Sequence, residues 1–162
     1  MANVDNPNGF YPSRNIVNPS YIPVIQGDLK SGENLAAGDG VIAASGFMSI
    51  LLSNSGVVMG VLAEPINATS AATTGGFHPA VPSLFFHGQC DTGTDYVEAT
   101  YRYTKVDMTG TTGVMELDLN ETTEDHMFIY DLYRDPLNSI GAHSRLEFYF
   151  AHGEFGGSST PL

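Results

Sequence analysis

The chain has 162 residues, a length that predicts one domain whose core needs no disulfide or metal for stability. Six Lys and Arg stand against 18 Asp and Glu, which gives a net charge of −12 at pH 7. Because the six basic residues are scattered along the chain, we expect no direct binding to nucleic acid or to an anionic membrane. The low charged fraction of 15%, with 18 Gly and 9 Pro, favours an all-β protein.

Residues 1–20 are predicted to form an extended N-terminal arm. Pro7, Pro12 and Pro19 forbid a helix there. The apolar residues Phe10 and Ile16 can pack against another apolar surface. These contacts are either with its own domain or with a neighbouring subunit, and the sequence leaves both open.

Short apolar runs separated by turn residues predict a β-barrel or sandwich over residues 21–155. The clearest group is residues 41–44, 47–52 and 57–63, with a hairpin turn at 54–56 where Asn54 and Gly56 tolerate positive φ. Further strands are predicted over residues 21–26, 84–87, 96–104, 114–119, 126–133 and 145–150. The last of these alternates cleanly, with Leu146, Phe148 and Phe150 on one face.

Two other segments are predicted to lack regular structure. Residues 66–82 are rich in Ala, Ser, Thr and Gly and are predicted to form a long surface loop. Residues 156–162 are predicted to form a flexible C-terminal tail. We expect eight or nine antiparallel strands and no helix.

Sequence motifs for catalysis and metal binding are absent. The histidines form no His-Glu-x-x-His run, and there is no Gly-x-Ser-x-Gly elbow and no phosphate-binding Gly-x-x-x-x-Gly-Lys. The segment from Asp118 to Asp125 begins like a calcium loop but has Thr123 where Gly is required. We therefore expect no enzyme activity, no cofactor and no metal site.

The single cysteine, Cys90, excludes an intrachain disulfide. The chain has no apolar run long enough to span a membrane, and its N-terminus resembles no secretion signal.

Several stretches resemble the head decoration (capsid cement) proteins of tailed bacteriophages. The opening Met-Ala-Asn-Val-Asp-Asn-Pro-Asn-Gly-Phe-Tyr-Pro-Ser-Arg is similar to their short N-terminal arms. Gly38-Asp39 before a strand and Gly60-Val61 closing a hairpin are similar to the start of their barrel. The later order of residues 115–119, 127–132, 135–138, Gly141 and 146–152 is also similar. One departure is that residues 91–104 lack an acidic-acidic-Pro turn before the aromatic strand.

The resemblance implies a structural virion protein on the outer capsid surface, made in the host cytoplasm. Such a protein binds the assembled shell as a homotrimer and stabilises it by bridging subunits of the major capsid protein. The residues that the resemblance assigns to capsid binding are those of the arm, namely Phe10, Tyr11, Arg14 and Ile16.

Two alternatives from other functional classes remain. A glycan- or receptor-binding β module would use residues 66–82 or a tyrosine platform drawn from Tyr101, Tyr103, Tyr130, Tyr133 and Tyr149. A small metal-dependent barrel enzyme would draw its ligands from His78, His87, His126, His143 and His152.

Overall fold

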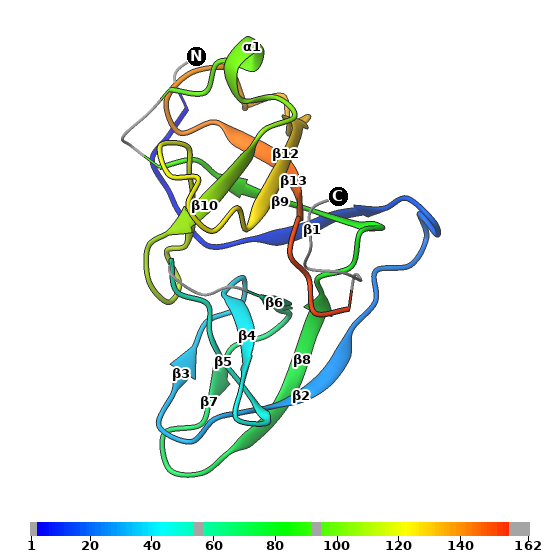
Figure 1. Cartoon of the computed structure of the whole chain (residues 1–162), viewed down its shortest axis with the longest axis vertical. Coiled ribbons are helices and arrows are strands. Elements are labelled where there is room, and N and C mark those ends of the chain that lie inside the picture. Colours follow the sequence, from blue (N-terminus) through cyan, green and yellow to red (C-terminus); the bar gives the residue numbers. More distant parts are fainter. Residues whose placement is uncertain (1–2, 54–56, 92–94, 156–162) are drawn as a thin grey trace.

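A computed structural model describes residues 3–53, 57–91 and 95–155. The protein is almost entirely β, as predicted, and is arranged as two lobes (Figure 1). The predicted turn at 54–56 and the predicted tail at 156–162 lie outside the described residues.

The first lobe is a closed five-stranded barrel with the strand order β2-β5-β4-β6-β8. Its strands are β2 (Ile25–Leu29), β4 (Gly40–Ala44), β5 (Phe47–Ile50), β6 (Val58–Leu62) and β8 (Thr73–Pro79). All neighbours pair antiparallel except β2 and β5. A two-stranded ribbon of β3 (Asn34–Leu35) and β7 (Ile66–Asn67) accompanies the barrel.

The second lobe is a six-stranded antiparallel sheet with the order β1-β9-β13-β12-β10-β11. Its strands are β1 (Tyr11–Asn15), β9 (Leu84–Gln89), β10 (Lys105–Thr109), β11 (Glu116–Asp118), β12 (Met127–Leu132) and β13 (Arg145–Phe150). The predicted strands over 41–44, 47–52, 57–63, 84–87, 114–119, 126–133 and 145–150 each overlap an observed strand.

The predicted strand over residues 96–104 is wrong. The segment forms a one-turn helix, α1 (Glu98–Tyr101), and Tyr103 has a positive φ of 66° that ends any extended run. Val97, Ala99, Tyr101 and Tyr103 alternate with polar residues in the sequence, but Val97 and Tyr103 lie exposed while Tyr96 is fully buried. The strand that follows, β10, was not predicted, although its Val106 and Met108 are buried.

The predicted loop over residues 66–82 is also wrong, because it contains the seven-residue strand β8. Its glycines indicated a loop, yet they lie in a strand with close neighbours. A Cβ atom on Gly75 would lie 2.2 Å from Cδ1 of Ile66, so glycine lets the Ile66 side chain of β7 pack closely against β8. The strand predicted over 21–26 instead begins at Ile25 and runs to Leu29.

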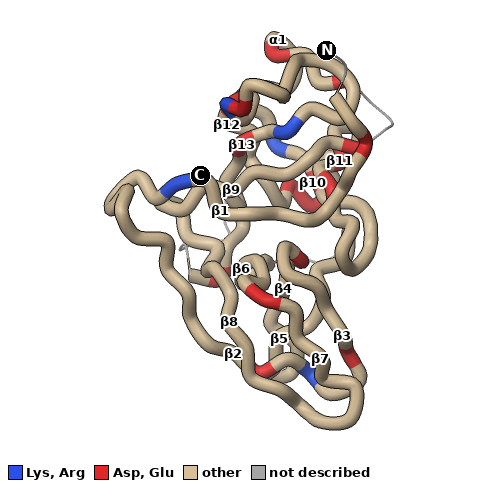
Figure 2. Tube along the Cα trace, turned by 180° about the vertical axis from the view of Figure 1, so that it is seen from behind, with Lys and Arg blue, Asp and Glu red and all other residues tan. Residues whose placement is uncertain are grey.

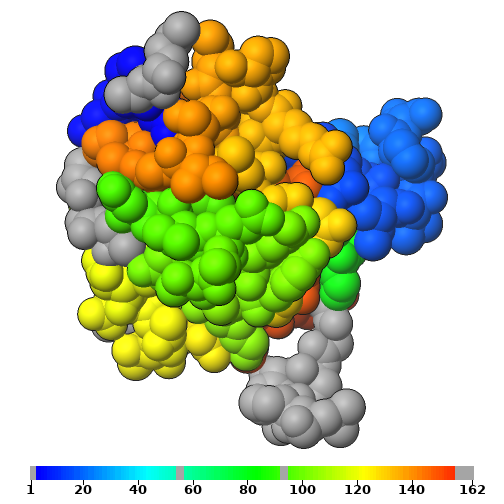
Figure 3. All heavy atoms as spheres, turned by 90° about the horizontal axis from the view of Figure 1, so that it is seen from above, coloured from blue at the N-terminus to red at the C-terminus, as the bar shows by residue number. Residues whose placement is uncertain are grey.

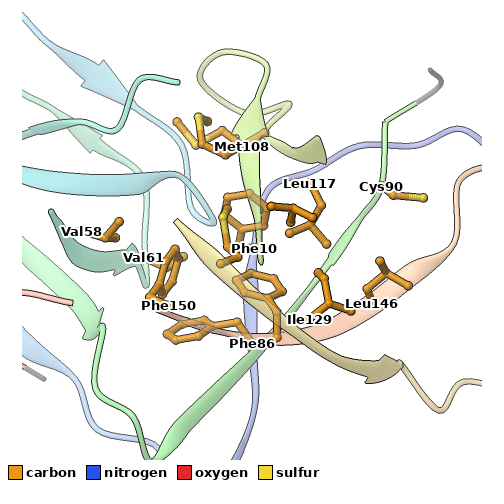
Figure 4. Packing of buried hydrophobic residues seen from close by; sticks show 14 of the residues in the cluster. Phe10, Val58, Val61, Phe86, Cys90, Met108, Leu117, Ile129, Leu146 and Phe150 are labelled. Atoms are coloured by element: carbon orange, nitrogen blue, oxygen red, sulfur yellow. The ribbon is translucent and has the colours of Figure 1, made fainter. Parts of the chain in front are cut away.

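One hydrophobic core joins the two lobes. The inner face of the sheet contributes Phe86, Ile129 and Phe150, and the barrel contributes Val58 and Val61 (Figure 4). A second cluster, which includes Leu29, Met48 and Phe77, fills the barrel itself.

Phe10, from the predicted arm, lies at the centre of the shared core and is fully buried. Its ring meets Phe148 edge-on, with centroids 5.3 Å apart, and packs over Gly88, where a Cβ atom would lie 2.5 Å from Cδ1 of Phe10. Its backbone N–H donates to the carbonyl oxygen of Gly38 at 2.8 Å, at the entrance to the barrel. The N-terminal segment therefore connects the sheet to the barrel.

Asp39 makes a second connection between the lobes. This fully buried carboxylate accepts hydrogen bonds from the backbone N–H groups of Ala36 and Gly113, at 2.8 and 2.7 Å, and from the hydroxyl of Thr112. It thereby joins the start of β4 to the turn between β10 and β11, and its buried charge is fully hydrogen-bonded.

We predict that Phe10→Ala lowers the free energy of unfolding by about 3–5 kcal/mol, because it leaves a cavity where three aromatic side chains meet. The matched control, Ile16→Ala, removes an exposed side chain of the same segment and should change stability by less than about 0.5 kcal/mol. Urea unfolding followed by circular dichroism measures both. Equal losses for the two variants would contradict a core role for Phe10.

Candidate interaction surfaces

The four arm residues predicted to bind a capsid occupy different environments. Phe10 is buried in the core and presents no surface to a partner. Tyr11 and Arg14 lie on the outer face of the sheet, and Ile16 is 56% exposed where the chain leaves β1. The structure thus places Tyr11 and Arg14 on one surface and Ile16 at the start of another.

The second of these surfaces is the 16–24 loop, which joins β1 to β2 and projects from one side of the molecule (blue in Figure 3). No charged residue occurs in it. Four of its five large apolar side chains are exposed, most of all Val17 at 79%, whereas Ile22 packs against the core. Exposed apolar side chains gathered on a projection are typical of a protein-binding surface.

The 16–24 loop is held in shape by hydrogen bonds at its base. The buried Asn15 side chain accepts from the N–H groups of Val17 and Asn18, at 3.0 and 3.2 Å, and donates to the carbonyl oxygen of Tyr21 at 3.1 Å. Near the other end, the carbonyl oxygen of Pro23 contacts Nδ1 of His78 at 2.9 Å. A loop ordered in this way loses little conformational entropy on binding.

The outer face of the sheet carries aromatic rings that contact one another across the strands. Its members are Tyr11, Phe85, His87, Phe128, Tyr130, Tyr133 and Tyr149, which we call the aromatic face. The Arg14 guanidinium lies 4.8 Å from the ring centre of Phe85 and 5.0 Å from that of Tyr130, distances typical of cation–π contacts. This arrangement covers Phe85, which is only 6% exposed, and leaves the other rings half-buried.

Next to the aromatic face lies a groove of about 350 Å³. Its polar lining consists of Arg14, Arg102, Arg134, Tyr130, Tyr133, Asp131 and Glu147, and we call it the arginine groove. Five of the six basic residues belong to the sheet lobe, and three of them line this groove. Acidic residues gather instead around β10 and β11 (red in Figure 2).

Ion pairs order the groove. Arg14 contacts Glu147 through two bonds, Nε to Oε1 at 3.1 Å and Nη2 to Oε2 at 2.9 Å. Arg102 donates from Nη2 to Oδ2 of Asp131 at 3.0 Å. Burial lowers the pKa of Arg14, but the charge and hydrogen bond of Glu147 and the contact with Tyr130 together raise it above the usual value. Arg14 is therefore held in its charged form.

Of the tyrosines predicted to form a platform, Tyr103, Tyr130, Tyr133 and Tyr149 belong to or border the aromatic face. Tyr101 packs against the core instead. The sequence indicated the residue type but not the grouping, because the rings come from strands that are distant in the chain.

A polar cluster lies around Gln89, where β9 ends and the antiparallel strand β13 begins. The Gln89 side chain donates to Oδ1 of Asp5 at 3.1 Å and to Oε1 of Glu116 at 3.4 Å, and it contacts Nδ1 of His143 at 3.3 Å. Burial, together with the charges of Asp5 and Asp91, raises the pKa of Glu116 to about 7. Glu116 therefore changes its charge near neutral pH.

No three of the five histidines that were candidates for a metal site form a group among the described residues. Within the three described stretches of chain, no group of three or more His, Cys, Asp or Glu side chains could hold a metal ion. The acidic segment that began like a calcium loop folds around Asp107, whose carboxylate accepts from the N–H groups of Thr123 and Glu124. No helix among the described residues is both long and apolar enough to cross a membrane.

His87 is expected to make stability depend on pH. Its ring stacks on Tyr133, with centroids 4.1 Å apart, and burial, with the positive charge of Arg145, lowers its pKa from 6.5 to about 4 although Asp135 opposes this shift. Between those two pH values the unfolded chain binds a proton that the folded chain does not, so the His87 contribution to stability is lost as the pH falls.

We predict that His87→Phe, which keeps a stacking ring, removes this dependence. The free energy of unfolding of the wild type minus that of the variant should fall by about 1–2 kcal/mol from pH 6.5 to pH 4. This is less than the pKa shift alone would give, because the ring is partly exposed to solvent. Glu116 acts in the opposite direction between pH 4.5 and 7, but it is present in both proteins and cancels in the difference. A difference that does not vary with pH would contradict the buried neutral imidazole.

Comparison of the chain with protein-family models, with curated proteins and with solved structures gives no match. Function is therefore inferred from the two surfaces themselves, the 16–24 loop and the aromatic face with its arginine groove.

Proposed function

We propose that the protein is a structural component of a virion, without enzyme activity, that binds the outer surface of an assembled capsid. It stabilises the shell by bridging subunits of the major capsid protein, and it acts as a homotrimer of the head-decoration class. The single observation that supports this proposal best is the projecting, uncharged and apolar 16–24 loop, held in shape by Asn15.

A projecting apolar loop suits adhesion to a protein neighbour. It can enter a cleft between two subunits and bury its side chains there, as the central residues of protein interfaces do. A protein that binds only the assembled shell stabilises that shell by mass action, and repetition over the lattice multiplies a modest affinity at each site. The net charge of −12 suits an outer surface that does not contact packaged nucleic acid.

The loop, rather than the whole arm, is the part to test. Deletion of residues 1–14 would remove Phe10 and most of β1, so a loss of binding after that deletion would report unfolding as readily as a lost contact. Single exposed residues of the loop avoid this difficulty.

We predict that Val17→Asp weakens binding to shells by at least about tenfold, because it places a charge in an apolar contact. The matched control is Leu137→Asp, since Leu137 is 72% exposed, close to the 79% of Val17, but lies after β12. Binding is measured by co-sedimentation with empty shells of the major capsid protein from the same virus, and mass by light scattering. A monomer without affinity for those shells, or equal binding by Val17→Asp and wild type, would overturn the proposal.

A second function, attachment to a glycan or receptor, is favoured by a separate observation. The half-buried rings of the aromatic face stand beside a groove whose lining includes both hydrogen-bond donors and acceptors. Aromatic walls with a few fixed polar groups are typical of small-ligand sites. This surface and the 16–24 loop are distinct, so one protein has room for both functions.

A further inference from the structure

The arginine groove holds one positive charge that the protein does not neutralise. Its two carboxylates, Glu147 and Asp131, are paired with Arg14 and Arg102. Arg134, which follows β12, is exposed and makes no ion pair with any residue in the described part of the chain. In a protein with a net charge of −12, an unpaired guanidinium in a groove is an anchor for one anionic group of a ligand.

The rings that line the groove are fixed in position. Tyr133 stacks on His87 at an interplanar angle of 10°, and Tyr130 contacts both the Arg14 guanidinium and the ring of Phe85. Rings held in this way form a rigid wall, and a rigid wall can bind the apolar C–H face of a sugar ring without a cost for ordering side chains.

The polar lining suits hydroxyl groups better than it suits a purely anionic ligand. Guanidinium groups only donate hydrogen bonds and carboxylates only accept them, whereas a hydroxyl does both. A sugar can therefore contact Arg14, Asp131 and Glu147 together. The carboxylate side chains of a peptide rich in Asp and Glu offer only acceptors, so they can bind the guanidinium groups but cannot donate to Asp131 or Glu147.

We propose that the arginine groove binds a saccharide that carries one carboxylate, with a sugar ring against the tyrosines and the carboxylate on Arg134. The groove volume of about 350 Å³ lies within the range of small-ligand pockets, roughly 300–1,000 Å³, and fits one or two sugar rings. This inference rests on the second proposed function, glycan attachment, and is independent of capsid binding through the 16–24 loop.

The test compares glucuronic acid with glucose, which differ only at C6, where glucuronic acid has a carboxylate and glucose a hydroxymethyl group. Each is titrated into the protein while amide and arginine Nε–H signals are followed by NMR. We expect glucuronic acid to bind more tightly than glucose and to shift signals of Tyr133 and Arg134. Arg134→Gln should weaken glucuronic acid binding about tenfold, the value of one charge-assisted hydrogen bond, and should leave glucose binding unchanged.

Lys30→Gln is the matched control, because it removes one positive charge at the far end of the barrel, just after β2. It should leave the affinity for both sugars unchanged. An equal effect of Lys30→Gln and Arg134→Gln would show general charge attraction and would overturn the site.

The remaining outcomes separate the two levels of the proposal. Equal binding of glucose and glucuronic acid would overturn the carboxylate specificity but leave glycan attachment standing. Absence of binding by either sugar at millimolar concentration would overturn both. Tighter binding of inorganic phosphate or of tetraglutamate than of glucuronic acid would overturn the assignment to a saccharide. Arg134→Gln should still co-sediment with capsid shells, and this measurement keeps the two functions distinguishable.

Discussion

The burial of one phenylalanine ring near the N-terminus is a central contact between the two lobes of this protein. Phe10 fills a space over Gly88 in the sheet, and its N–H donates to the carbonyl oxygen of Gly38 at the barrel entrance. Because this ring is fixed, β1 begins at Tyr11 and pairs with β9. The aromatic face and the base of the 16–24 loop both depend on that pairing, since Arg14 and Asn15 belong to β1.

Side chains on the sheet alternate between an inner face that packs into the core and an outer face that is open to solvent. The protein therefore presents the aromatic face and its arginine groove without exposing the core. Alternation along β13 points Phe148 inward and Glu147 outward, where Glu147 pairs with Arg14 of β1. Bulges in β1 and β12 change this alternation locally and turn Arg14 and Tyr130 toward each other. The groove is thus a consequence of two irregularities in an otherwise regular sheet.

The sequence was sufficient for the fold class and for the strands with the clearest patterns. The six alternating residues of β13 were located without error, because one of its faces is buried along its whole length. The pattern was misleading over residues 96–104, where a chain reversal and one helical turn replaced a strand, and over residues 73–79, where glycines serve close packing. The arginine groove was not predictable, because Arg14, Arg102 and Arg134 are distant in the chain and meet only through sheet pairing that the sequence does not specify. Phe10 was assigned to a surface because its burial depends on residues almost eighty positions later.

The edge strands of the sheet have a consequence for molecules that meet at high concentration. At one edge, β11 is short and the N–H of Asp91 donates to its Leu117. The other edge strand is β1, which pairs only with β9 among the described strands and carries Pro12, a bulge and a charged arginine, three features that discourage strand pairing between molecules. These features therefore disfavour the growth of a continuous intermolecular sheet along β1.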